Sequence, residues 1–177
     1  RLSRHGVLGL ARSLGAIGYH LAGRDRRIAE ANLSLAFDDS LNEAQREAII
    51  RSSFGNFART ILDAVWFAHD SAARLRRWVH IPEAALAALP PDRPAILVTA
   101  HLGNWEALGQ ALTLAGVPLM SVAAPLANPV VDRLFLRIRQ KTGQIIVPRE
   151  GAVRRLIRHL KQNGKVAMLL DQNTKPQ

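Results

Sequence analysis

The stretch that decides the fold is Ala95-Ile-Leu-Val-Thr-Ala-His101-Leu-Gly-Asn-Trp-Glu106. An apolar, β-branched run stops at a histidine, turns through Gly103-Asn104 and restarts with a carboxylate. This order predicts a buried strand over residues 95–100, a tight turn, and a helix that begins after Asn104, a good N-cap residue. The strand would carry His101 to the carboxyl edge of a sheet, where open α/β folds bind their ligands.

His101 and Glu106 form a His-x4-Glu spacing across this turn. Glu106 falls in the first turn of the predicted helix, where negative charge is favoured. From there it would fold back to one imidazole nitrogen and leave the other facing a substrate. The pattern therefore predicts a general base, His101, oriented by a carboxylate, Glu106. The alternative for Glu106 is simple capping of the first helical turn.

Before residue 90 the apolar residues recur with helical periodicity. The predicted helices span residues 1–22, 26–37, 42–68, 71–79 and 82–89. In the third helix, a stripe predicted to be buried consists of Ile50, Phe54, Phe57, Ile61 and Val65. Pro90, Pro91 and Pro94 then break the chain before the first strand.

After residue 91 strands alternate with helices. Strands are predicted over residues 95–100, 119–123, 144–147 and 165–170, and helices over 105–115, 129–142 and 152–162. A strand–helix–strand unit repeated three times predicts an α/β fold in which a helical amino-terminal region packs on a mixed, largely parallel sheet with flanking helices. We expect a single domain over residues 1–177, with a helical lead-in over 1–90 and an α/β catalytic part over 91–177.

The 177 residues carry 24 Lys and Arg against 14 Asp and Glu, a formal net charge of +10. Such a field favours polyanions: nucleic acid, anionic lipid head groups or phosphorylated substrates. Aromatic residues make up only 5% of the chain, which is little for base stacking, and no nucleic-acid-binding motif appears. The charge favours a membrane surface or a phosphate-bearing substrate as partner, and no nucleic acid.

The first predicted helix is amphipathic. Leu10, Leu14, Ile17 and Leu21 recur at helical spacing on one face. No run of about 18 apolar residues occurs that would span a bilayer. Two interpretations stay open: an ordinary surface helix packed on the domain, or a helix that lies on a membrane.

Several common chemistries are excluded by their missing motifs. The chain has no Cys, no Gly-x-Ser-x-Gly elbow, no phosphate-binding glycine loop and no His-Glu-x-x-His zinc motif. The other histidines are scattered without ligand spacing. We predict neither a metal site nor a cofactor.

Thr99-Ala-His101-Leu-Gly-Asn-Trp-Glu106 strongly resembles the signature of the lipid A biosynthesis lauroyl/myristoyl acyltransferases, within the lysophospholipid acyltransferase superfamily. The resemblance continues through Arg26 to Phe37 and Ser53 to Thr60, and through further short motifs in the family's order. These motifs are Asn128-Pro129, Gly143, Pro148-Arg149 and Asp171-Gln172. The resemblance therefore covers nearly the whole chain. It departs at Asp38, where a proline is usual.

The resemblance implies a glycerolipid acyltransferase-like fold, truncated at both ends in this chain. It implies His101 and Glu106 as catalytic residues, and substrate-binding roles for Asn104, Arg139, Arg149, Asp171 and Gln172. Arg139 matches an arginine that is associated with phosphate-bearing substrate, although a solvated helix face is the competing interpretation. Asn104 also suits a helix cap. Asp171 and Gln172, with Asn173, would order the wall of the site.

The implied reaction moves a fatty acyl chain from a thioester, of acyl carrier protein or coenzyme A, to a hydroxyl of a lipid A-type glycolipid precursor of lipopolysaccharide. Another glycolipid acceptor, such as a phosphatidylinositol mannoside, is an alternative. A non-catalytic basic module that binds membrane or nucleic acid is the alternative from another class. The enzyme would work at the cytoplasmic face of the inner membrane, peripherally or anchored by a segment outside this chain.

Overall fold

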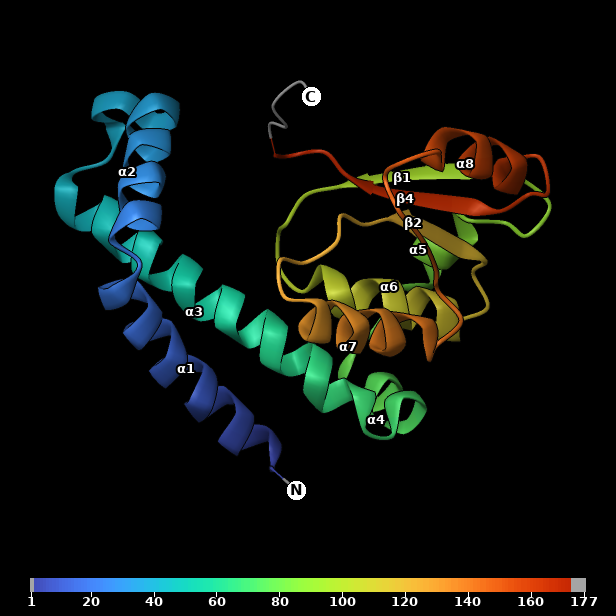
Figure 1. The fold of residues 1–177 in the computed structure, drawn as a ribbon, viewed down its shortest axis with the longest axis horizontal. Helices are drawn as coiled ribbons and strands as arrows, with labels where there is room; N and C mark the ends of the chain where they lie inside the picture. Colours follow the sequence, from blue (N-terminus) through green and yellow to red (C-terminus); the bar gives the residue numbers. More distant parts are fainter. Residues whose placement is uncertain (1, 173–177) are drawn as a thin grey trace. The chain divides into compact units, whose positions relative to one another are not determined.

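The computed structural model describes residues 2–172 and consists of two compact units, Arg1–Trp66 and Phe67–Gln177 (Figure 1). The first unit is helical. It contains α1 (Arg4–Leu21), α2 (Gly23–Phe37), a short 3-10 turn (Asp38–Ser40) and most of α3 (Glu43–Ala68). These helices confirm the predicted ones to within a few residues at each end.

α1 packs on α3 through a close glycine contact, an ion pair and a few buried side chains. A Cβ on Gly15 would stand 2.6 Å from the Cα of Gly55, so the two helices approach too closely there for a side chain on Gly15. At the start of α1, the guanidinium of Arg4 binds the buried carboxylate of Asp63 on α3. The indole N–H of Trp66 donates to the backbone carbonyl of Leu2 at 3.0 Å.

The predicted buried stripe of α3 is only partly correct. Ile50 is buried, but Phe57 is 59% exposed and Val65 is 45% exposed. The buried face is rotated toward Thr60 and Asp63, because Asp63 must face Arg4. A pattern of apolar residues alone does not reveal such a polar contact.

The second unit alternates helices and strands. Its elements are the end of α3, α4 (Ser71–Trp78), α5 (Glu83–Ala87), β1 (Ala95–Thr99), α6 (Trp105–Leu114), β2 (Leu119–Val122), α7 (Pro129–Gln140), β3 (Ile145–Val147), α8 (Ala152–Leu160) and β4 (Lys165–Leu169). The predicted lead-in ended near residue 90, whereas the compact units divide inside α3. α4 and α5 go with the sheet because Ile81, Leu86 and Leu89 around them pack on the cluster of Leu112, Val117 and Leu119.

The four strands form one sheet in the order β1-β4-β2-β3, and every pairing among them is parallel. This confirms the predicted α/β class. β4 lies between β1 and β2, and its Leu169 pairs with Thr99 of β1. The carboxyl ends of all four strands therefore meet at one edge of the sheet.

Helices cover both faces of this sheet (Figure 1). On one face, Ala152 and Leu156 of α8 pack against Met120, Val147 and Val166. On the other face, Leu112 of α6 packs with Val117 and Leu119, and α7 lies beside α6. Val147 and Val166 are completely buried, as expected for strands covered on both sides.

Lys165 fixes the proline-rich segment that leads into β1. Its side chain is completely buried at the start of β4. The ammonium donates to the backbone carbonyls of Pro90, Arg93 and Asn163 at 2.6, 2.7 and 2.9 Å. These bonds satisfy a buried charge and set the position from which β1 begins.

Within the part of the chain that the structure describes, no helix combines the length and the apolar character needed to cross a membrane.

Candidate active site

His101 and Asp171 meet at the carboxyl edge of the sheet because their strands are neighbours. Thr99 pairs with Leu169, and the backbone N–H of Leu170 donates to the carbonyl of Thr99 at 3.1 Å. Two residues beyond this pair, the backbone N–H of His101 donates to Oδ2 of Asp171 at 2.9 Å. Nδ1 of the imidazole lies 2.8 Å from Oδ1 of the same carboxylate. One carboxylate thus holds both the backbone and the ring of His101.

This contact determines which imidazole nitrogen is available. A carboxylate accepts hydrogen bonds, so Nδ1 is the protonated nitrogen and Nε2 of a neutral ring is the acceptor. The side chains of His101 and Asp171 are 33% and 35% exposed, so a substrate can reach them. The ring of Trp105 makes an edge contact with the imidazole at 4.8 Å between centroids and 76° between planes. Asp171 and Trp105 together fix the direction of Nε2.

The hydrogen bonds to Asp171 stabilise its charged form. The backbone N–H of His101, and then its side chain, hold the pKa of Asp171 below its ordinary value of 3.8. Because the folded value lies below the unfolded one, the contribution of this contact to stability is present above the ordinary value. It is lost as the pH falls through the lowered value. At neutral pH Asp171 is therefore an ionised partner for His101.

Gly103 and Asn104 form the turn between His101 and α6. Gly103 has φ +64, a left-handed conformation that side chains rarely adopt, and open space surrounds the position of a Cβ. This confirms that Gly103 supplies a backbone conformation. Oδ1 of Asn104 accepts the N–H of Ala107 at 2.9 Å and caps α6, which confirms the capping role.

The His-x4-Glu spacing predicts a contact between Glu106 and His101, but Glu106 binds a different residue. Both of its oxygens bind Arg139 of α7: Nε donates to Oε2 at 2.9 Å and an Nη donates to Oε1 at 2.6 Å. The side chains of Glu106 and Arg139 are 7% and 17% exposed. The reason is geometric: from the first turn of α6, Glu106 faces the neighbouring helix α7, whereas Asp171 follows the strand next to β1.

Arg139 is engaged within the protein. Burial lowers its pKa, but the hydrogen bond and the charge of Glu106, with a smaller contribution from Asp132, outweigh burial and raise it. Its guanidinium is thus the partner of Glu106 rather than an open cation on a helix face. The bidentate pair joins the start of α6 to α7 and so braces the helix that follows the His101 turn.

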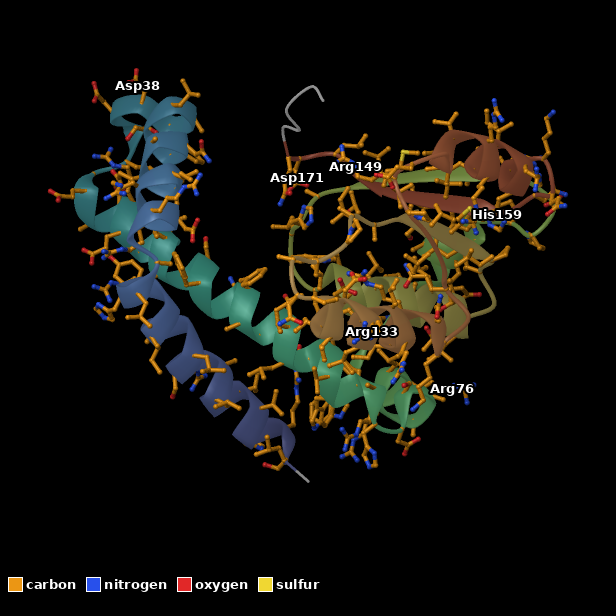
Figure 2. All side chains as sticks on the ribbon, viewed as in Figure 1. Asp38, Arg76, Arg133, Arg149, His159 and Asp171 are labelled. Atoms are coloured by element: carbon orange, nitrogen blue, oxygen red, sulfur yellow. The ribbon has the colours of Figure 1, made fainter. Side chains whose placement is uncertain are left out.

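The remaining predicted substrate residues lie at the same sheet edge. Arg149 follows β3, and its side chain is exposed. Gln172 follows Asp171 and is also exposed. Figure 2 labels Arg149 and Asp171, each just beyond the end of its strand. Asn173 lies outside the described residues.

Sequence similarity to known proteins identifies the family of this chain. Residues 4–177 match the family of bacterial lipid A biosynthesis acyltransferases. The chain belongs to this family. It is also 27% identical over 149 residues to a lipid A biosynthesis acyltransferase of Haemophilus influenzae. That alignment covers 81% of this chain and 45% of the relative, so the chain spans less than half of the relative's length.

The sequence does not predict the contact between His101 and Asp171. It predicts Glu106 as the carboxylate that orients His101, and Asp171 as a residue that orders the wall of the site. The missing information is the strand order, because only the adjacency of β1 and β4 brings residues 101 and 171 together. An acidic residue directly after a buried strand is the signal that could have suggested it.

No group of three or more metal-ligating side chains occurs among residues 2–172.

Proposed function

We propose that this chain is the catalytic part of an acyltransferase that moves a fatty acyl chain from a thioester to a hydroxyl of a lipid A-type glycolipid precursor. The observation that carries the proposal is the exposed His101, whose Nδ1 is held by Asp171 at the edge of the sheet. Membership of the lipid A acyltransferase family supports a glycolipid of the lipid A type as the acceptor. Acyl carrier protein or coenzyme A would carry the donor thioester.

His101 acts as the general base in this reaction. Nε2 accepts the proton of the acceptor hydroxyl while the hydroxyl oxygen attacks the thioester carbonyl. A C–O bond forms, the C–S bond breaks, and the imidazolium returns the proton to the departing thiolate. Asp171 keeps the correct tautomer and stabilises the positive charge on the ring. The acyl group passes directly from donor to acceptor.

Glu106 and Arg139 support the site without entering the reaction. Their buried ion pair holds the start of α6, and with it the turn through Gly103 that follows His101. We propose that Glu106 is a positioning residue. Glu106 then occupies the Nε edge of the Arg139 guanidinium, and the Arg139 side chain is only 17% exposed, which leaves it less accessible to a phosphate of the acceptor.

We propose that Arg149 binds the acceptor's phosphate instead. The ends of β1 and β3 are three strand spacings apart, about 14 Å, so an extended disaccharide head group reaches from His101 to Arg149. An exposed guanidinium there matches the planar geometry of a phosphate. The acceptor places this reaction at a membrane surface, and we propose the cytoplasmic face of the inner membrane.

Transfer from a radiolabelled thioester donor to a bis-phosphorylated lipid A precursor tests both parts of the proposal. Arg149→Ala should raise the apparent KM for this acceptor by about ten- to a hundredfold, since charge-assisted hydrogen bonds contribute about 1.5–3 kcal/mol. For the dephosphorylated acceptor the same substitution should change KM little.

Arg76→Ala is the matched control, because Arg76 is an exposed arginine of the same unit on α4 (Figure 2). If Arg149→Ala changed the apparent KM equally for the phosphorylated and dephosphorylated acceptors, Arg149 would not bind the phosphate. Efficient transfer to a phosphatidylinositol mannoside but not to the lipid A precursor would reassign the acceptor. Absence of transfer from either donor to any acceptor would favour the non-catalytic binding module.

A further inference from the structure

α1 has two unlike faces, and one of them packs against α3 within the first compact unit. The inner face consists of Val7, Ala11, Gly15 and Tyr19, all buried. The contact of Gly15 with Gly55 brings this face against α3. The inner face therefore accounts for the packing of α1 within its unit.

The outer face carries an apolar stripe that the described residues leave exposed. Its members recur at i, i+4, i+7 and i+11, and their exposed fractions are 39% for Leu10, 42% for Leu14, 52% for Ile17 and 81% for Leu21. A continuous exposed apolar surface of this kind indicates an interaction site rather than an ordinary solvated helix face. The packed inner face fits the first interpretation of this helix, and the exposed stripe leaves room for the second, contact with a membrane.

Polar contacts at both ends hold α1 along α3. Near its start, Arg4 binds Asp63 and Trp66 binds the carbonyl of Leu2. Near its end, the hydroxyl of Tyr19 donates to Glu47 at 3.1 Å. These contacts fix the inner face of α1, and the four side chains of the stripe stay exposed along the helix.

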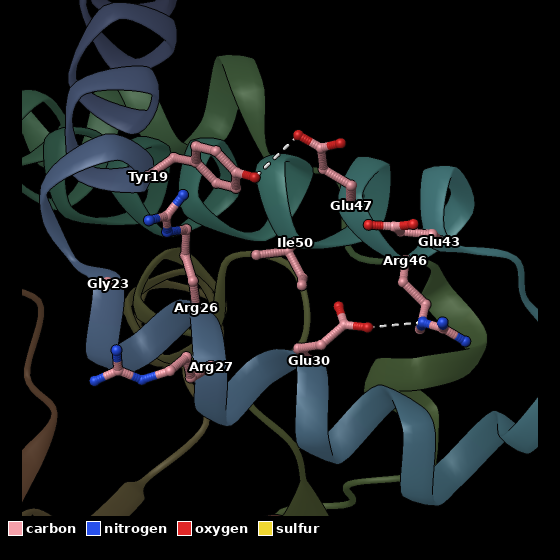
Figure 3. A pocket seen from close by; sticks show the side chains of 9 residues that line it. All are labelled: Tyr19, Gly23, Arg26, Arg27, Glu30, Glu43, Arg46, Glu47 and Ile50. Atoms are coloured by element: carbon pink, nitrogen blue, oxygen red, sulfur yellow. Dashed lines mark hydrogen bonds and ion pairs between the residues drawn. The ribbon is translucent and has the colours of Figure 1, made fainter.

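The positive charges near the stripe indicate that the surface it binds is anionic. Residues 1–27 contain six arginines and a single acid, Asp25. Arg24 and Arg27 are exposed at the start of α2, directly after the end of the stripe. On the inner side, Arg26 of α2 stacks on Tyr19 at 4.9 Å from its ring centre. Figure 3 shows both side chains, with Arg27 nearby on α2. An apolar stripe followed by arginines matches the boundary between the head groups and acyl chains of an anionic bilayer.

We propose that α1 is an interfacial helix, whose outer stripe of Leu10, Leu14, Ile17 and Leu21 inserts into the surface of an anionic lipid bilayer. This inference rests on the proposed function in one respect: a glycolipid acceptor resides in a bilayer, and α1 is the surface that brings the protein to it. A second copy of the chain is the competing occupant of the stripe.

Sedimentation with lipid vesicles tests the inference directly. We expect the protein to bind vesicles that contain phosphatidylglycerol more tightly than vesicles of phosphatidylcholine alone. Leu14→Ser/Ile17→Ser should weaken this binding by about ten- to a hundredfold, because two half-exposed side chains lose their burial in the bilayer. The matched control is Ile28→Ser/Leu35→Ser, which removes one Ile and one Leu from exposed positions of α2.

A fluorescent label locates the contact independently. The chain contains no Cys, so Ile17→Cys and Ala31→Cys each create a single labelling site. An environment-sensitive dye at residue 17 should shift to the blue on addition of anionic vesicles and be quenched by spin-labelled lipid. The same dye at the exposed residue 31 should respond little.

Unchanged vesicle binding by Leu14→Ser/Ile17→Ser, or an equal loss in the control, would overturn the inference. It would also be overturned if the dye at residue 17 responded to protein concentration without lipid, because that result would assign the stripe to a second copy. The acyl-transfer assay in detergent tests the proposed enzyme activity without a bilayer, so its result is independent of the vesicle-binding test of α1. Loss of vesicle binding by the stripe variant supports the interfacial helix whether or not the wild-type protein transfers acyl groups.

Discussion

His101→Ala is expected to lower kcat/KM for acyl transfer by about 10²–10⁴-fold, the range for loss of a general base. Nε2 is the acceptor for the proton of the attacking hydroxyl, and alanine offers no substitute. The side chain of His101 is one-third exposed, so the substitution removes little packing and should leave the melting temperature nearly unchanged. Initial rates with a labelled thioester donor measure the effect.

His80→Ala is the control, since His80 is an exposed histidine of the same unit. It should retain wild-type activity. Near-normal turnover by folded His101→Ala protein would exclude general-base catalysis at this position, and with it the mechanism proposed above.

Glu106→Gln should lower the free energy of unfolding by about 3 kcal/mol, because it leaves the guanidinium of Arg139 without its counter-charge in a largely buried site. A further Arg139→Met substitution in this variant should recover part of the loss, since no charge is then left unpaired. Urea unfolding of the single and double variants measures both changes. Glu106→Gln should also lower the rate of acyl transfer, because the turn at Gly103 that follows His101 is no longer held in place. The added Arg139→Met substitution should restore part of this rate together with part of the stability.

Glu47→Gln provides the comparison for an exposed pair. Glu47 and Arg51 are 48% and 50% exposed, so water screens this ion pair. Gln at position 47 can still accept the hydrogen bond of Tyr19, so Glu47→Gln should destabilise the protein much less than Glu106→Gln. If Glu106→Gln were no more destabilising than Glu47→Gln but still abolished transfer, Glu106 would act in the chemistry rather than in the support of α6.

Periodicity was sufficient to predict the elements of this fold, because each one carries its own local signals. Asn104 and Asn128 cap the helices that follow them, and left-handed Gly116 and Gly143 follow the helices that they end. The burial of α3 was less predictable. Its buried face includes Asp63, whose partner Arg4 lies far away in the sequence, so no local pattern indicates it.

The candidate site shows the same division between local and distant information. His101 and its turn follow from one short stretch of sequence, as do the roles of Gly103 and Asn104. The partners of His101 and Glu106 depend on which elements become neighbours. Placing β4 beside β1 gives His101 a carboxylate from Asp171, and placing α7 beside α6 gives Glu106 an arginine.

The most direct test is to identify the protonated nitrogen of His101 by ¹⁵N NMR at neutral pH. In wild-type and in Glu106→Gln protein we predict a proton on Nδ1, because Asp171 accepts its hydrogen bond. In Asp171→Asn the side-chain amide can donate to Nδ1, so the proton should move to Nε2. A change of tautomer in Glu106→Gln, with none in Asp171→Asn, would contradict the assignment of Asp171 as the residue that orients the base.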